Sequence, residues 1–219
     1  MRALKHRFGP TGELGVFEMT GQGLVTVEDP SGRMLGDRLT DAAGSAVAVT
    51  IEGRRAVVLE AQALLVKTDV PTARRSATGF DQKRLAMLLA VMQKQLPIGD
   101  FSKQDAYLSI VGGLRVSEPG ADLAVCGAIA SSIAEKPLPA DLIAIGEVGL
   151  AGEVRSVGAI DRRLAEAARL GFNHAIIPAR DVTGKEPLRV TGAVTLRDAI
   201  GAMGLLGSRA PSRPGIAAA

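Results

Sequence analysis

The stretch SEPGADLAVCGAIASS, residues 117–132, carries the strongest structural signal in the chain. The Pro119–Gly120 pair predicts a turn, and the small and aliphatic residues after it predict a buried helix from about Gly120 to Ala134. Asp122 is the only charged residue of this helix and lies where the helix dipole favours an acid. Some hydrolases place a nucleophilic serine in a turn of this kind, so the glycine at position 120 is the first functional question.

The segments on both sides of this turn predict an α+β domain that contains hairpins and β-α-β-like crossovers. A hairpin is expected over residues 45–67 around Glu52 and Gly53, and Asp81 is expected to cap a helix with leucines at helical spacing. The other predicted elements are a strand at 106–113, a strand and hairpin in 142–158, a helix from 160 that ends at Gly171, a strand at 174–179, and a strand and short helix in 188–206. Residues 71–79 are expected to form a polar loop.

Composition divides the chain into three parts. Residues 1–40 are predicted to be a basic entry segment followed by lead-in strands, and residues 41–206 a compact domain. Residues 207–219, rich in Pro, Ser, Gly and Ala, are predicted to be a disordered tail. Aromatic residues make up only 3% of the 219 residues, so the core must be built from Ala, Val, Leu and Ile.

Several classes of function are disfavoured by what the sequence lacks. It contains no apolar run of the ~18–20 residues that a membrane helix needs and no visible signal peptide, which makes the cytoplasm the default location. A single cysteine excludes an internal disulfide and a multi-cysteine zinc site, and no other metal-ligand pattern is present. The chain also has no P-loop motif, so P-loop nucleotide binding is not predicted.

The two residue types most often used for acid–base or nucleophilic chemistry have simpler structural interpretations here. His174 stands at the start of a predicted strand, and Cys126 lies inside the apolar helix, where a thiol without a neighbouring base is inert.

The chain has a formal net charge of +3, and eight of its basic residues stand in four adjacent pairs. Solvated surface is the plainer interpretation of these pairs, and a phosphate-facing surface is the alternative. The pairs are Arg54–Arg55, Arg74–Arg75, Lys83–Arg84 and Arg162–Arg163.

A family resemblance is carried by three ordered stretches. They read RRSATGFDQKRLAMLLAV at 74–91, VGGLRVSEPGADLAVCGAIASS at 111–132 and IGEVGLAGEVRSVGAIDRRLAEAARLGF at 145–172. Together they resemble the C-terminal domain of the RadA (Sms) family of bacterial DNA-repair proteins, which is itself similar to the proteolytic domain of Lon. The resemblance runs from about Lys5 to about Gly204 and implies a Lon-protease-like fold of the type of ribosomal protein S5 domain 2.

The same resemblance answers the question about Gly120. Lon-type proteases use a Ser-Lys dyad, with the serine in a G-P-S-A-G turn that matches residues 118–122 and the lysine in a V-G-G-L-K stretch that matches residues 157–161. Gly120 occupies the serine position and Asp161 the lysine position. Glycine has no nucleophile, and an aspartate there is expected to stay ionised and cap the helix. We therefore expect no peptidase activity; the alternative is an atypical serine peptidase that uses Ser117.

The entry segment carries a second family motif. KHRFG, residues 5–9, resembles the KNRFG motif that follows the family's ATPase core, with His6 in place of Asn. This implies that Lys5 and Arg7 reach the nucleotide of a neighbouring subunit in a ring. Family members carry a zinc finger and a RecA-like ATPase before this motif, so the chain is expected to be a fragment. ATP, Mg²⁺ and Zn²⁺ are expected in those N-terminal domains, and no cofactor is expected in this chain.

The resemblance implies a non-proteolytic scaffold domain of a DNA-dependent ATPase that drives branch migration in homologous recombination. The implied partners are other copies of the chain in a hexamer, single-stranded or branched DNA, and a RecA-type recombinase. The candidate phosphate-binding residues are Arg74, Arg75, Lys83 and Arg84, followed by Arg54 and Arg55. The scarcity of aromatic residues argues against a base-stacking platform. The alternative is a pure oligomerisation module without DNA contact.

Overall fold

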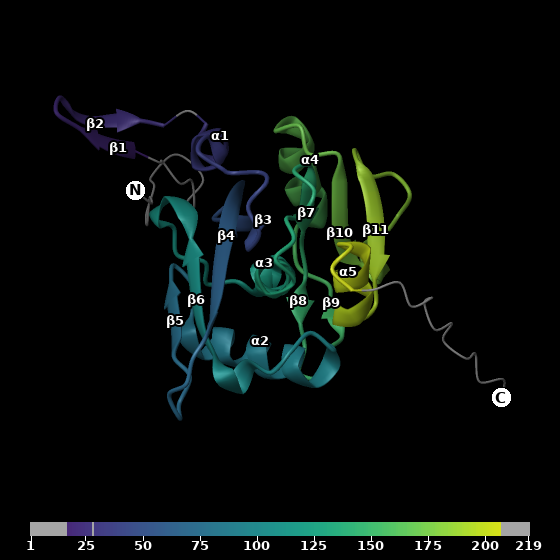
Figure 1. The fold of residues 1–219 in the computed structure, drawn as a ribbon. Coiled ribbons are helices and arrows are strands. Elements are labelled where there is room, and N and C mark those ends of the chain that lie inside the picture. The colour runs from purple at the N-terminus through teal and green to yellow at the C-terminus, as the bar shows by residue number, and fades with distance from the viewer. Residues whose placement is uncertain (1–16, 28, 207–219) are drawn as a thin grey trace, which may run out of the picture.

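A seven-stranded mixed sheet organises the protein in the computed structural model, which describes residues 17–27 and 29–206. The strand order is β11-β10-β7-β3-β4-β6-β5 (Figure 1). Pairing is antiparallel for β3 with β4 and for β4 with β6, and parallel in the other pairs. The strands are β3 (Ser45–Glu52), β4 (Arg55–Lys67), β5 (Arg75–Thr78), β6 (Gln104–Ile110), β7 (Leu142–Ala144), β10 (His174–Pro178) and β11 (Arg189–Ala193). The prediction of hairpins together with crossovers in one mixed domain is confirmed.

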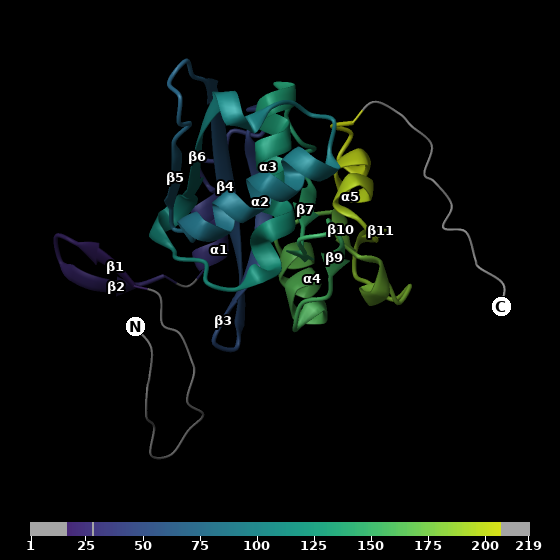
Figure 2. The same cartoon turned by 90° about the horizontal axis from the view of Figure 1, so that it is seen from below.

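Helices cover the sheet on both faces (Figures 1 and 2). One face is packed by α2 (Gln82–Gln95), α3 (Asp122–Ala134) and α5 (Leu196–Ala202), and the other by α4 (Ile160–Arg169) and by Leu35 at the end of α1 (Pro30–Leu35). Successive residues of a strand point to opposite faces. On β3, Ala46 and Ala48 therefore join the first core, and Val47 and Val49 join the second.

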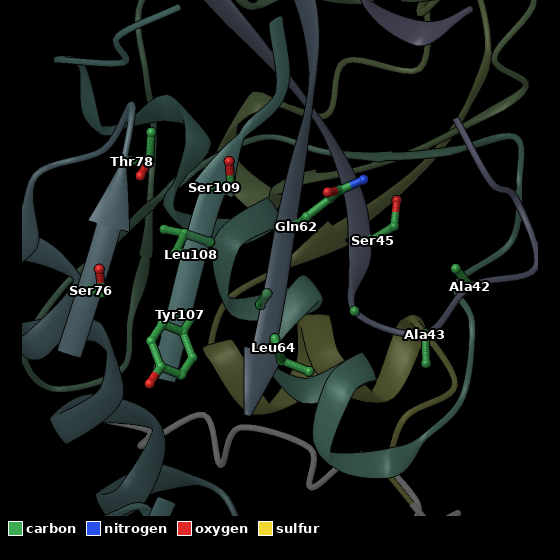
Figure 3. A pocket seen from close by; sticks show the side chains of 12 residues that line it. Ala42, Ala43, Ser45, Gln62, Leu64, Ser76, Thr78, Tyr107, Leu108 and Ser109 are labelled. Carbon is green, nitrogen blue, oxygen red and sulfur yellow. The ribbon is translucent and has the colours of Figure 1, made fainter. Parts of the chain in front are cut away.

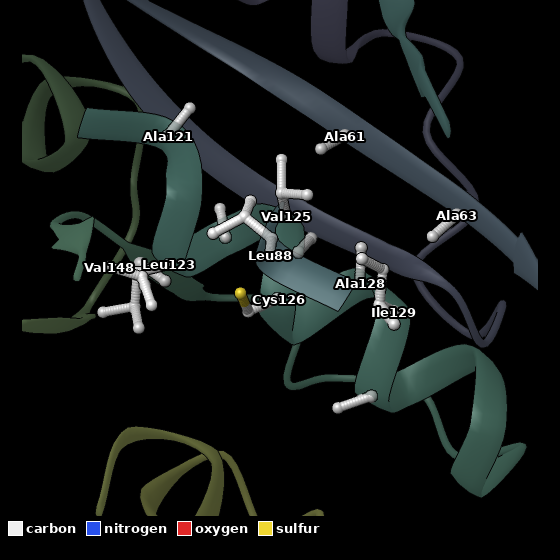
Figure 4. Close-up of a cluster of buried hydrophobic side chains, with 14 of the residues drawn as sticks. Ala61, Ala63, Leu88, Ala121, Leu123, Val125, Cys126, Ala128, Ile129 and Val148 are labelled. Carbon is white, nitrogen blue, oxygen red and sulfur yellow. The ribbon is translucent and has the colours of Figure 1, made fainter. Parts of the chain in front are cut away.

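Helix α3 is the centre of the larger core, as the apolar stretch predicts. Every residue from Asp122 to Ser131 is buried, and the helix crosses beneath β3 and β4 (Figure 4). Small side chains permit this close packing: a Cβ added at Gly127 would lie 2.8 Å from the Met203 sulfur. The core is thus made of small aliphatic groups in van der Waals contact, which suits a chain with few aromatic residues.

The ends of the helices follow local chemistry. The Asp81 carboxylate accepts a hydrogen bond from the Arg84 N–H at 2.8 Å and caps α2, as predicted. Gly171 ends α4 in a left-handed conformation, φ 88°, and the Phe172 N–H donates to the Ala167 carbonyl at 3.1 Å. Short 3₁₀ turns join other elements: η1 (Phe101–Lys103), η2 (Val111–Gly113), η3 (Pro119–Ala121) and η4 (Ala179–Asp181).

The lead-in contains strands, as predicted, which pair as a hairpin, and it also contains a helix that was not predicted. β1 (Phe17–Thr20) pairs with β2 (Gly23–Thr26), and α1 follows with Asp29 as its N-cap. Ser31 ties α1 to the domain, because its hydroxyl donates to Glu166 at 3.0 Å and accepts the Val58 N–H at 3.1 Å. The boundary at residue 40 stays a prediction, and residues 1–16 and 207–219 lie outside the described residues.

The prediction of a polar loop over 71–79 is wrong, because β5 forms there and pairs in parallel with β6. Asp105 accepts the Arg74 N–H at 2.7 Å, and the Arg75 guanidinium donates to the main-chain carbonyls of Phe101 and Gln104. These contacts join segments far apart in sequence, so a local pattern does not reveal them.

The remaining strand pair, β8 (Glu147–Val148) and β9 (Val154–Arg155), is the predicted hairpin near 142–158.

Two left-handed glycines provide a test of this packing. Gly44 has φ 87°, and an added Cβ would lie 2.3 Å from the Ala63 carbonyl oxygen; Gly171 has φ 88° but open space around it. We expect Gly171→Ala to lower the free energy of unfolding by about 1–2 kcal/mol, the cost of a left-handed alanine. Gly44→Ala should cost at least twice as much, because the backbone must also move. Urea unfolding of both variants measures this, and equal losses would contradict the packing at Gly44.

Candidate functional site

The turn that precedes α3 is held by main-chain hydrogen bonds on both sides. The Glu118 carboxylate accepts the Gly120 N–H at 3.2 Å and so caps η3. The Gly120 carbonyl accepts the Gly146 N–H at 3.0 Å, and the Gly146 carbonyl accepts the Leu123 N–H at 3.2 Å. Residue 120 is therefore fixed beside the segment that joins β7 to β8.

A buried arginine fills the space next to this turn. The Arg163 side chain on α4 is 2% exposed and forms a bidentate ion pair with Glu118, with N···O distances of 2.7 and 2.8 Å. Its Nε donates to the Gly158 carbonyl at 2.9 Å, and Nη1 also donates to the Val49 carbonyl. One guanidinium thus joins the turn to β3, to α4 and to the loop before it.

The ion pair occupies the volume that a side chain at position 120 would need. A Cβ added to Gly120 would lie 2.8 Å from Arg163 Nη1 and 2.8 Å from both Glu118 oxygens. A serine cannot be accommodated there while the pair keeps its geometry.

Asp161, which the resemblance assigns to the lysine position of the dyad, is exposed in the first turn of α4. The expectation that it caps this helix is wrong, because Ala159 is the N-cap, with φ 60° and no side-chain hydrogen bond. An ionised aspartate in the first turn nevertheless suits the helix dipole.

The electrostatics of the turn favour an ionised Glu118. Burial opposes its charge, but the hydrogen bonds and positive charge of Arg163, together with the Gly120 N–H, outweigh burial and hold the pKa of Glu118 below its ordinary value of 4.5. The Glu118 carboxylate is therefore charged at neutral pH and is committed to Arg163.

A second ion pair lies at the start of α3. Asp122 is fully buried, accepts hydrogen bonds from both Nε and Nη2 of Arg84 on α2, and accepts the Val148 N–H at 3.1 Å. Burial raises the pKa of Asp122, and the hydrogen bonds from Arg84 and Val148 act against that rise. The pair connects α2, α3 and β8, so the Arg84 guanidinium is bound within the fold.

The basic pairs of the sequence have different surroundings. Arg75 and Arg84 are engaged with carbonyl and carboxylate oxygens, whereas Arg74 and Lys83 are exposed. Arg54 and Arg55 are exposed at the β3–β4 turn. Helix α4 contacts this turn, where Arg162 Nη1 donates to the Arg54 carbonyl at 3.1 Å. Glu166 on α4 binds Arg169 at 2.9 Å rather than the neighbouring Arg162 or Arg163.

His174 and Cys126 have structural surroundings. The His174 ring forms a 2.8 Å hydrogen bond with the Thr191 hydroxyl, and burial together with nearby Arg189 lowers its pKa. Complete burial raises the pKa of the Cys126 thiol, which keeps it protonated.

Three further predictions from the sequence concern membrane helices, metal sites and the roles of Lys5 and Arg7. Within residues 17–27 and 29–206, no helix is long and apolar enough to cross a bilayer, and no group of His, Cys, Asp and Glu is arranged to hold a metal ion. Lys5 and Arg7 lie outside these ranges, so their predicted role is untested.

Comparison with known proteins places this geometry in a family. The model of the Lon protease (S16) C-terminal proteolytic domain matches residues 90–197. These residues have the fold of a Lon C-terminal domain. The expectation of a Lon-protease-like fold is confirmed. The match of the turn at residues 118–122 to the serine turn of Lon proteases stays a prediction, and this turn is called the Lon turn below.

The chain is homologous to proteins named DNA repair protein RadA. It is 43% identical over 204 residues to that of Bacillus subtilis, 43% over 203 residues to that of Halalkalibacterium halodurans, and 46% over 204 residues to that of Salmonella typhimurium. Each match covers 91% of this chain but 44% of the relative. The chain therefore spans less than half the length of these relatives.

The Glu118–Arg163 pair in the Lon turn was not predicted from the sequence, because 45 positions separate its members. One signal was available. On α4 the buried positions are 163, 164 and 167, so Arg163 interrupts the apolar face of a helix with a charge. A lone charge on an apolar face requires a buried partner, and the nearby turn offers Glu118.

Removing one member of this pair should be costly. Arg163→Ala leaves Glu118 without its partner, so the free energy of unfolding at pH 7 should fall by about 3–5 kcal/mol. Arg169→Ala, which breaks two ion pairs of a half-exposed arginine, with Asp29 and with Glu166, should cost about 1 kcal/mol or less. Denaturant unfolding measures both variants, and equal losses would contradict the structural role of Arg163.

The same pair predicts a pH dependence. The folded-state pKa of Glu118 is lowered, so its stabilisation is complete above the unfolded value of about 4.5 and is lost as pH falls through the folded value. The stability difference between the natural chain and Glu118→Gln should therefore be large at pH 7 and shrink in acid. A difference that stays constant from neutral to acid pH would contradict the assignment.

Proposed function

We propose that this chain is a non-proteolytic Lon-type scaffold of a RadA-type DNA-repair ATPase, which supports assembly of a ring and binds DNA phosphates during homologous recombination. The observation that carries the proposal is the Glu118–Arg163 pair beside Gly120. Where a Lon protease has a nucleophile, this chain has a glycine whose neighbouring space is taken by an ion pair. A domain that lacks a nucleophile in this turn can still act by binding other subunits and DNA through its surfaces.

An atypical serine peptidase is the less favoured alternative. Ser117 is exposed on the approach to the turn, and a serine hydroxyl needs a nearby base to attack a carbonyl. The His174 ring is engaged with Thr191, and the Lys136 ammonium donates to the Gly204 carbonyl at 2.8 Å. Both groups are thus engaged with partners other than Ser117.

The exposed cations are the proposed contacts for DNA phosphates. Arg74 and Lys83 form one candidate surface; Arg54, Arg55 and Arg162, around the β3–β4 turn, form the other. Arg75 and Arg84 belong to the original set of candidates, but their guanidinium groups hold the fold together, so we assign them a supporting role. Binding of this kind is salt-dependent and nearly independent of base sequence.

The remaining parts of the proposal rest on the family. The relatives are named for DNA repair, which supports a role in that process. A hexameric ring, a RecA-type recombinase partner, a cytoplasmic location and contact of Lys5 and Arg7 with a neighbour's nucleotide are inferred from the resemblance alone. ATP, Mg²⁺ and Zn²⁺ would act in parts of the longer relatives that this chain does not match.

The loss of peptidase chemistry can be tested by restoring the dyad. We expect neither the natural chain nor Gly120→Ser/Asp161→Lys to cleave casein, because a side chain at 120 meets Arg163 and Glu118. The double variant should also unfold at lower urea concentration. Cleavage by the natural chain that disappears in Ser117→Ala would overturn the scaffold proposal.

The phosphate surface can be tested by salt titration. Arg74→Ala and Lys83→Ala should each weaken binding to duplex DNA and reduce the log–log salt slope by about 0.9 for each lost phosphate contact. Lys185→Ala, which removes an exposed cation from the loop after η4, is the matched control and should change neither quantity. If light scattering shows a ring but no variant alters DNA binding, the chain is an assembly module without this DNA surface.

A further inference from the structure

One region of the sheet is not covered by any of the described helices. Helices α1 and α4 cover the second core, but beyond it β4, β6 and β5 carry side chains that face solvent, including Leu64 at 58% and Tyr107 at 38% exposure. These side chains and the segment 42–44 enclose a concavity of about 460 Å³ (Figure 3). The opposite face of the same strands, with Ala63 and Leu108, is buried against the larger core.

Strand register arranges the open face in rows. Leu64 pairs with Tyr107, which pairs with Ser76, so an aliphatic, an aromatic and a hydroxyl group lie side by side. Two residues along the strands, the neighbouring row consists of Ser45, Gln62, Ser109 and Thr78. Strand spacing is about 4.8 Å and alternate residues are about 6.7 Å apart, so a planar ring lying on the first row reaches the second.

The two rows have complementary chemistry. The first offers an apolar and aromatic surface on which a base can stack. The second offers uncharged donors and acceptors. Gln62 lines the concavity, and because its Nε2 already donates to Glu60 at 3.2 Å, its side-chain Oε1 is the atom that can accept a further hydrogen bond. This combination of a stacking surface with neutral hydrogen-bonding groups is the chemistry that recognises an unpaired base.

A cation stands beside these rows. Arg74 is exposed and immediately precedes β5, two residues before Ser76, which pairs with Tyr107. The nearby Asp105 carboxylate accepts the Arg74 main-chain N–H at 2.7 Å and the Tyr107 hydroxyl at 3.4 Å, and among the described residues it forms no ion pair with the Arg74 guanidinium. The Arg74 guanidinium is thus the group available to a phosphate attached to a base stacked on Tyr107.

We propose that this open sheet face, here called the β4–β6–β5 face, binds an unpaired nucleotide of single-stranded DNA. The base stacks on Tyr107 against Leu64, its edge meets Gln62, Ser109 and Thr78, and its phosphate meets Arg74. The proposal rests on the DNA-binding function proposed above and specifies its ligand. It also departs from the expectation of no stacking platform, since the one tyrosine of the chain lies on the open face.

A second copy of the chain is the main rival occupant. The centres of protein interfaces are depleted of serine, whereas this face carries Ser45, Ser76 and Ser109 as well as Thr78. The hydroxyl-rich row therefore favours a polar planar ligand over an apolar protein surface.

The chain supplies its own probe, because it has one tyrosine and no tryptophan. Tyrosine fluorescence of the full chain therefore reports on Tyr107 alone. Titration with an oligothymidylate of about ten nucleotides should quench this fluorescence, and a duplex of equal length should not. Free N-acetyltyrosinamide in the same titration corrects for light absorbed by the DNA.

Variants then separate stacking from charge. Tyr107→Ala should weaken single-strand binding about five- to hundredfold, and Tyr107→Phe should restore most of it, because phenylalanine keeps the ring. Phe17→Ala is the matched control, since Phe17 is 37% exposed on the β1–β2 hairpin, and it should bind like the natural chain.

Each outcome decides between the two proposals. Single-stranded DNA that binds without quenching and without sensitivity to Tyr107→Ala overturns the stacking site, while the phosphate-directed function stands. Absence of binding to either DNA at low salt overturns both. If Tyr107→Ala instead lowers the oligomeric state measured by light scattering, the β4–β6–β5 face is an interface between copies and the nucleotide proposal is wrong.

Discussion

The interaction on which the rest depends is the buried ion pair between Arg163 and Glu118. A guanidinium cannot stay buried without acceptors, and here the carboxylate and the carbonyl oxygens of Gly158 and Val49 supply them. Because these acceptors come from β3, from the Lon turn and from the loop before α4, one side chain sets the distance between three parts of the fold. The position of the turn, and with it the start of α3, follows from this contact.

Around that point the fold is built by close approach of small side chains. Helix α3 is buried along most of its length, and Gly127 lets Met203 of the segment after α5 come near its backbone. The Arg84–Asp122 pair joins α2 to the same helix in the place where an acid also suits the helix dipole. Arg75 and Arg84, which the sequence suggested as contacts for DNA, thus form hydrogen bonds within the fold. The exposed basic side chains among the candidates are Arg74, Lys83, and Arg54 and Arg55 at the β3–β4 turn.

Local signals predicted most elements of this fold. The hairpin of β3 and β4, the Asp81 cap and the end of α4 at Gly171 depend on residues within one turn or one strand pair. Strand β5 was not predicted, because its partner β6 begins about thirty positions later and its stability comes from Asp105 and from carbonyls near η1. At the site, the empty serine position was visible as Gly120, but the pair that fills the space spans 45 positions and needed the folded chain.

The ion pair also has an evolutionary consequence. An ancestral protease that loses its serine to glycine can regain it by one substitution as long as the space beside that residue stays free. Here Arg163 and Glu118 lie 2.8 Å from where the first side-chain atom would return. A substitution that adds a side chain at position 120 alone would therefore disturb the buried ion pair, so it would need compensating changes at Glu118 or Arg163.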